Sequence, residues 1–133
     1  MSRRSGFTFI ELLIVLAILA VLAAILVPNQ MKARARGATT NCKSNLKDIG
    51  TALEMYSTDH KGLYPTRSEL LTPRYLKTIP TCRSTGTVTY VFSMASNPDR
   101  YTVCCGGMNH VSSGIKAANY PQYTSVTGLI ERP

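Results

Sequence analysis

Four cysteines and two histidines are the side chains of this 133-residue chain whose types are best suited to covalent or metal chemistry. The cysteines are Cys42, Cys82, Cys104 and Cys105. Adjacent cysteines hold their Cα atoms about 3.8 Å apart, which is shorter than the separation of about 4.4–6.8 Å that a disulfide needs. Two pairings therefore stay open: Cys42–Cys104 with Cys82–Cys105, or the exchanged pairs. Neighbouring side chains on a strand face opposite ways, so each adjacent cysteine can reach a different partner, and we expect the first pairing.

A zinc site is the alternative for the same region, with Cys82, Cys104, Cys105 and His110 as its ligands. The spacing argues against it, because the chain has no C-x2-C pair and two adjacent thiolates chelate one ion awkwardly. An even number of cysteines in an exported chain is typical of a disulfide framework. We therefore expect two disulfides, no metal and no cofactor. His110 is interpreted as a loop residue that makes a local hydrogen bond.

Catalytic motifs are absent from the sequence. It contains no G-x-S-x-G, no H-E-x-x-H and no phosphate-binding glycine loop, so we do not expect an enzyme. The formal net charge of +8 favours anionic partners such as nucleic acid or acidic lipid. The densest basic cluster, Lys32, Arg34 and Arg36, directly follows an apolar run, where it is typical of an anchor at lipid headgroups.

Glu11 is the charged residue within the apolar run of residues 7–27. A helix of that length spans roughly 30 Å, the thickness of the hydrocarbon layer of a membrane. A carboxylate near the centre of that layer costs about 2.5–3.5 kcal/mol, so its presence calls for a function. Arg3 and Arg4 precede the run and predict a cytoplasmic N-terminus. The simplest interpretation is an uncleaved signal anchor on an extracytoplasmic domain.

The stretch "SGFTFIELLIVLAILAVLAAILVP" resembles the class III signal of type IV pilins and type II secretion pseudopilins. The resemblance implies that a prepilin peptidase cuts between Gly6 and Phe7 and that Phe7 is then N-methylated. A glycine before the cut lets the protease approach the backbone closely. The resemblance also implies that Glu11 sets the register of an incoming subunit against the Phe7 amine of a docked one. Such a pair would offset part of the desolvation penalty of the carboxylate.

The elements that follow predict an α+β chain with a type IV pilin-like fold. Pro28 lacks an amide hydrogen and should kink or partly melt the long helix. Beyond it, apolar residues at spacings of three and four, including Cys42, Leu46 and Leu53, predict an amphipathic half. We expect four segments: a leader (1–6), a membrane or filament-core helix (7–28), the amphipathic half (29–61) and a globular head (62–133).

The head is predicted to contain a short helix at "RSELL" and a small antiparallel sheet. Residues 87–94 and 100–105 alternate in the manner of strands, and "SNPD" between them is typical of a turn. Residues 122–131 are expected to hold a third, short strand.

The stretch "TALEMYSTDHKGLYPT" is similar to the end of the long helix in the major pseudopilin of type II secretion. However, the chain lacks the "DPWGxPY" segment that accompanies the calcium site of those proteins. After Glu69 its acidic residues are Asp99 and Glu131, too few for a typical calcium site. The choice between a pilus and a secretion pseudopilus therefore stays open.

These patterns together predict a structural subunit that polymerises through its N-terminal helix. The partners implied by the resemblance are other copies of the chain, a prepilin peptidase, an inner-membrane assembly platform and minor pilins or pseudopilins. The expected location is the bacterial inner membrane, spanned once with a cytoplasmic N-terminus, and then an extracytoplasmic filament. The alternative is a low-copy minor pilin whose basic head binds DNA or another anionic ligand.

Overall fold

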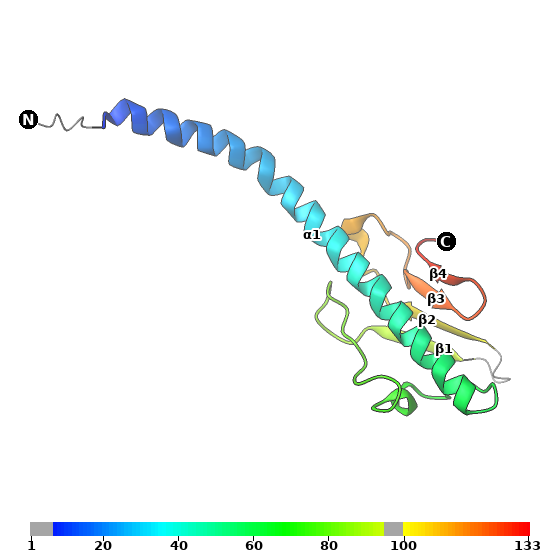
Figure 1. The fold of residues 1–133 in the computed structure, drawn as a ribbon. Coiled ribbons are helices and arrows are strands. Elements are labelled where there is room, and N and C mark those ends of the chain that lie inside the picture. The colour runs from blue at the N-terminus through cyan, green and yellow to red at the C-terminus, as the bar shows by residue number, and fades with distance from the viewer. Residues whose placement is uncertain (1–6, 95–99) are drawn as a thin grey trace, which may run out of the picture. The chain divides into compact units, whose positions relative to one another are not determined.

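The computed structural model describes residues 7–94 and 100–133. One long helix, α1 (Phe9–Asp59), is followed by a four-stranded sheet and two short 3₁₀ helices (Figure 1). The strands are β1 (Tyr90–Met94), β2 (Tyr101–Cys105), β3 (Gln122–Thr124) and β4 (Gly128–Ile130), and the 3₁₀ helices are η1 (Ser68–Leu71) and η2 (Val111–Ser113). This arrangement confirms the predicted α+β class.

The chain divides into two compact units, residues 1–34 and 35–133. The first unit contains the apolar N-terminal part of α1. The second contains the remainder of α1 and the whole sheet.

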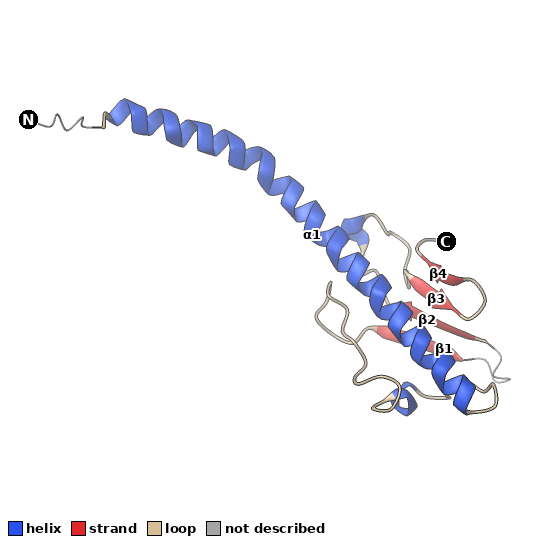
Figure 2. Ribbon diagram, in the orientation of Figure 1, coloured by secondary structure: helices blue, strands red, loops and turns tan. Residues whose placement is uncertain are grey.

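The sheet of the second unit is an antiparallel meander in the order β1-β2-β3-β4 (Figure 2). Tyr90 pairs with Cys105 at one end of the β1–β2 ladder, and Met94 pairs with Tyr101 at the other. The predicted third strand is in fact two strands, β3 and β4, which form a hairpin. Gly128 has a φ of +71°, a backbone conformation that glycine adopts without steric cost. The predicted "SNPD" turn lies at residues 96–99, outside the described part of the chain.

The core of the second unit lies between the sheet and the amphipathic stripe of α1. Cys42, Leu46, Ile49 and Leu53 are completely buried, which confirms the stripe expected from their spacing. Burial alternates along β2, so that Tyr101, Val103 and Cys105 face the core and the residues between them do not.

Gly50 of α1 lies directly against the sheet. A Cβ atom added there would lie 2.5 Å from Cε1 of Tyr123 on β3. The helix therefore carries a glycine at this position because the aromatic ring occupies the space of a side chain. Helix propensity alone would assign this glycine only a mild weakening of the helix.

Candidate functional site

Glu11 is part of the cap that begins helix α1. Its Oε2 atom accepts hydrogen bonds from the backbone N–H and the hydroxyl of Thr8, both at 2.8 Å. The Glu11 backbone N–H donates to Thr8 Oγ1 at 3.4 Å. This reciprocal arrangement is a capping box, whose sequence signal is Thr-x-x-Glu. Thr8 is therefore a functional residue that was not predicted, although the sequence contains its signal.

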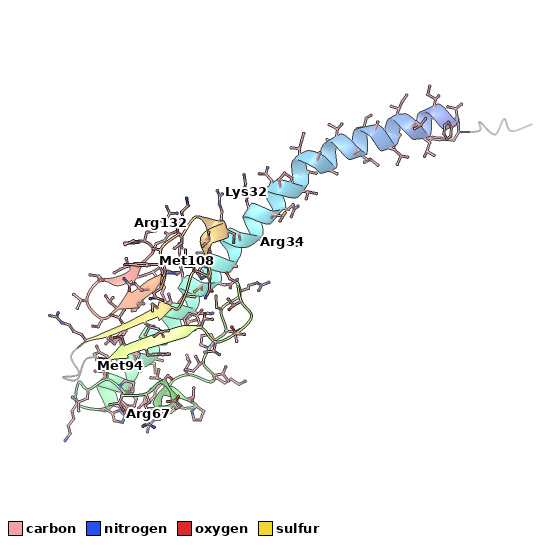
Figure 3. The ribbon with its side chains drawn as sticks, turned by 180° about the vertical axis from the view of Figure 1, so that it is seen from behind. Lys32, Arg34, Arg67, Met94, Met108 and Arg132 are labelled. Carbon is pink, nitrogen blue, oxygen red and sulfur yellow. The ribbon has the colours of Figure 1, made fainter. Side chains whose placement is uncertain are left out.

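The N-terminal part of α1 presents apolar side chains all around its axis. Its large apolar residues from Phe9 to Val27 are between 45% and 78% exposed, and Figure 3 shows side chains projecting along both edges of the ribbon. By length and composition alone, the helix can cross a membrane, and its most apolar 18-residue window has no buried residues. A helix that is hydrophobic all round belongs in lipid or in a bundle of other helices.

Pro28 lies inside α1, and the helix continues through it to Asp59. The partial melting expected there is therefore wrong, because loss of one backbone donor does not unwind the neighbouring turns. A kink at Pro28 stays a prediction. Lys32 and Arg34 extend from the helix after the apolar run (Figure 3), where their charges can interact with lipid headgroups.

The residues expected to be cut and modified are only partly within the described chain. Phe7 is described and its side chain is 74% exposed. Arg3, Arg4 and Gly6 lie outside the described residues. The assignment of the cleavage site therefore rests on the sequence.

The four cysteines are unpaired in the structure. Cys42, Cys82 and Cys105 are buried together, whereas Cys104 is on the other face of β2, with its Sγ atom 3.8 Å from the carbonyl oxygen of Val91. Alternation along the strand separates the adjacent cysteines as predicted, but the inward member is Cys105. This geometry disagrees with a Cys42–Cys104 bridge. Whether the chain forms disulfides stays a prediction.

His110 joins the three buried cysteines. It lies in a loop as predicted, but it is 2% exposed and its Nε2 atom lies 3.7 Å from Cys82 Sγ. The expected local hydrogen bond of its side chain is wrong, because the ring contacts residues that are distant in the sequence, such as Thr39. Hydrogen bonds from Cys42, and then from His110 and Thr89, lower the pKa of the Cys105 thiol against the opposing effect of burial. The sequence pairings brought Cys42 to one of the adjacent cysteines, but they did not predict that Cys42, Cys82 and His110 would meet at one place.

Comparison with known proteins places these features in a family. Residues 1–27 match the prokaryotic N-terminal methylation motif. The ComG operon protein 3 homolog of Bacillus licheniformis is 31% identical over 75 residues, which cover 56% of this chain and 77% of the relative. The chain belongs to the type IV pilin and pseudopilin family. Its N-terminal helix and methylation motif are those of a pilin precursor that is anchored in a membrane.

Two further relatives represent the two branches of the family. The type IV wide pilus major component PilA4 of Thermus thermophilus is 42% identical over 80 residues, 60% of each chain. The type II secretion system core protein G of Pseudomonas aeruginosa is 41% identical over 71 residues, 52% of this chain and 49% of the relative. The match thus spans less than two thirds of either relative. No solved structure matches the chain significantly.

These relatives are structural subunits and not enzymes, which agrees with the prediction that this chain is not an enzyme.

Proposed function

We propose that this chain is a prepilin, the precursor of a structural subunit of a type IV pilus or a type II secretion pseudopilus. A prepilin peptidase cuts it after Gly6, Phe7 is methylated, and the mature subunit polymerises through the N-terminal half of α1. The observation that carries the proposal is the continuous apolar surface of that half, whose side chains are exposed. Removing it from both water and lipid requires helices of other subunits.

The membrane covers this apolar surface before assembly, and the filament covers it afterwards. Before assembly the apolar half of α1 spans the inner membrane, with the leader on the cytoplasmic side and the head outside. An assembly platform and minor pilins or pseudopilins then start the filament. The final location is a periplasmic pseudopilus or a pilus on the cell surface.

Glu11 supplies the register of assembly. Both of its hydrogen bonds from Thr8 end on Oε2, and among the described residues no donor reaches Oε1. Cleavage after Gly6 creates a cationic amine on Phe7, which can pair with Oε1 in a neighbouring subunit. In low dielectric an ion pair offsets part of the cost of burying each charge, so the aligned register has the lowest energy.

The cleavage step is tested by Gly6→Ala in cells that express a prepilin peptidase. Because a methyl group blocks close approach to the backbone, the leader should stay on the chain, as mass spectrometry of the N-terminus would reveal. Gly37→Ala is the matched control, since a Cβ at Gly37 has nothing within 4 Å. It should be processed normally and begin with N-methylated Phe7. Normal processing of Gly6→Ala would refute the proposed cleavage site.

The register step is tested by Glu11→Gln, which keeps an oxygen to accept the Thr8 hydrogen bonds but removes the charge. We expect normal leader removal and a large loss of sheared filaments. Thr8→Val is the control: it removes the hydroxyl of the cap but keeps the charge of Glu11, and filaments should persist. Filaments of Glu11→Gln at the wild-type level would contradict a role of the charge in register.

The alternative function, DNA capture by a low-copy minor pilin, is favoured by the basic head. Among the described residues only Lys43 and Arg74 form ion pairs, and Arg67 and Arg132 extend from the head (Figure 3). This alternative predicts salt-dependent DNA binding and near absence of the chain from sheared filaments. The main proposal predicts that the chain dominates those filaments.

A further inference from the structure

Three cysteines and one histidine meet at a single point inside the head. Cys42 comes from α1, Cys82 from the connector before β1, Cys105 from the end of β2 and His110 from the loop that follows. All four are buried, and one candidate ligand atom from each lies within 4.8 Å of the others. The fold alone brings together residues that lie up to 68 positions apart in the sequence.

The distances fit four ligands around one ion. Cys82 Sγ lies 3.6 Å from Cys105 Sγ and 3.7 Å from His110 Nε2. Tetrahedral Zn²⁺ with bonds of about 2.3 Å to sulfur and about 2.0–2.1 Å to nitrogen places two sulfurs about 3.8 Å apart, and sulfur and nitrogen about 3.6 Å apart. The spacing is therefore that of neighbouring ligands.

His110 is oriented as a metal-binding histidine. Its Nδ1 atom lies 3.1 Å from the hydroxyl of Thr39 and 3.2 Å from that of Ser84. We assign the ring proton to Nδ1, which leaves the lone pair of Nε2 directed at the cysteines. In zinc sites the second ring nitrogen is held by an oxygen in the same way, which fixes the tautomer and the ring orientation.

Hydrogen-bond donors surround the sulfur atoms. The Tyr90 hydroxyl donates to Cys42 Sγ at 3.5 Å. Asn109 Nδ2 donates to Cys105 Sγ at 3.7 Å, and the Thr89 hydroxyl lies 3.5 Å from the same sulfur. Donors of this kind stabilise thiolates, the form in which cysteine binds metals.

The loop between Cys105 and His110 makes a tight turn. A Cβ at Gly106 would lie 2.9 Å from the carbonyl oxygen of Thr89, and Gly107 has a φ of +85°. The two glycines allow a C-x4-H turn that folds the imidazole back beside the sulfur of Cys105. Ligands separated by a few residues are common in structural zinc sites.

We propose that Cys42, Cys82, Cys105 and His110 form a tetrahedral Cys3His site for a structural Zn²⁺ ion. The ion would tie α1, the connector and the sheet together in a small head that has a limited core. The sequence argument against zinc required both adjacent cysteines to bind one ion. In the fold Cys104 faces away and Cys42 takes its place, so that objection does not apply.

A disulfide between Cys82 and Cys105 is the competing use of the same sulfurs. It would leave Cys42 as a buried thiol and give His110 no ligand role. The zinc site uses all four groups, which is why we favour it.

The test uses the full-length chain purified in detergent, with Zn²⁺ alone as the probe. We expect one zinc per chain by elemental analysis, loss of the metal to a strong chelator, and a lower thermal midpoint without it. Cobalt replacing zinc should give the absorption bands of a tetrahedral thiolate complex. A reduced, folded chain that binds no zinc, or an octahedral cobalt spectrum, would overturn the proposal.

Matched variants identify the ligands. Cys105→Ser should lose zinc binding, whereas Cys104→Ser, which changes the adjacent residue outside the cluster, should keep one ion per chain. His110→Cys should also keep the ion, because it restores four ligands, and it should change the cobalt spectrum. Thr39→Val should weaken zinc binding about tenfold by removing an outer hydrogen bond. Equal zinc content in the Cys105→Ser and Cys104→Ser proteins would refute the assignment.

Thiol counting decides between metal and disulfide. The protein from its native source is denatured with chelator but no reductant and then alkylated. Four free thiols agree with the zinc site, and in the folded protein only Cys104 should react quickly. Two free thiols, with a Cys82–Cys105 bridge in the mass spectrum, would overturn it.

Discussion

The two parts of helix α1 share one secondary structure and have opposite relations to water. Leu19, in the first part, is 55% exposed, whereas Leu53, in the second, is fully buried. The second part has one apolar stripe, which the sheet of the same chain covers. The first part is apolar on every face. Its apolar surface is larger than one small domain can cover. The difference teaches that the stripe of the second part belongs to the core of the head, whereas the exposed surface of the first part is of the kind that lipid or other helices cover.

The largest effect on stability is expected when one leucine in each part of α1 is replaced by alanine. Leu53→Ala should destabilise the head by about 2–5 kcal/mol, because it leaves a cavity against the sheet. Leu19→Ala should change the stability of the head by less than about 0.5 kcal/mol. Denaturant unfolding of the full chain in detergent, followed by tyrosine fluorescence, measures both. Equal effects would mean that the two parts do not differ as described.

Two glycines of α1 give the next comparison. Gly50→Ala should cost about 1–3 kcal/mol, because the new methyl group would overlap the ring of Tyr123. Gly37→Ala should stabilise the head by up to about 1 kcal/mol, because alanine favours the helix and nothing lies within 4 Å. Thermal midpoints that shift in opposite directions would support this account. A stabilising Gly50→Ala would contradict the close contact.

A buried hydroxyl inside the head should matter less than the packing around it. The Tyr101 hydroxyl donates to Glu54 Oε1 at 3.0 Å, so Tyr101→Phe should cost about 1.5 kcal/mol. Tyr75→Phe is the control, because its hydroxyl bonds Asp59 at an exposed position and its loss should cost less. Unfolding of both variants under identical conditions ranks them. A greater loss in Tyr75→Phe would reverse the expected order.

The smallest effect concerns the ion pair between Lys43 and Glu131, whose atoms Nζ and Oε1 are 2.9 Å apart. A hydrogen bond from Lys43 lowers the pKa of Glu131. The pair therefore stabilises the head above the usual carboxyl pKa, and this contribution is lost as the pH falls through the lowered pKa. Because the pair is partly exposed, Glu131→Gln should cost less than about 1 kcal/mol at neutral pH. High salt should reduce the difference, and a difference that grows on acidification would contradict the assignment.

Features that depend on neighbours along the chain could be predicted from the sequence. Continuous apolarity marked the N-terminal helix, a spacing of three and four marked the buried stripe, and alternation marked β1 and β2. The Thr8–Glu11 cap is also local, because its Thr-x-x-Glu signal marks the start of α1 within four residues. Alternation even separated Cys104 from Cys105, but it could not say which of them faces the core.

Features that join distant segments became visible in the folded chain. It placed Cys105 inward, brought Cys42 to Cys82 and His110, and set the ring of Tyr123 against Gly50. It also split the expected third strand into β3 and β4. No local pattern carries this information, because side chains separated by tens of residues meet only when the sheet packs against α1. The physical reason is that packing selects one arrangement of faces among several that the local periodicities allow equally.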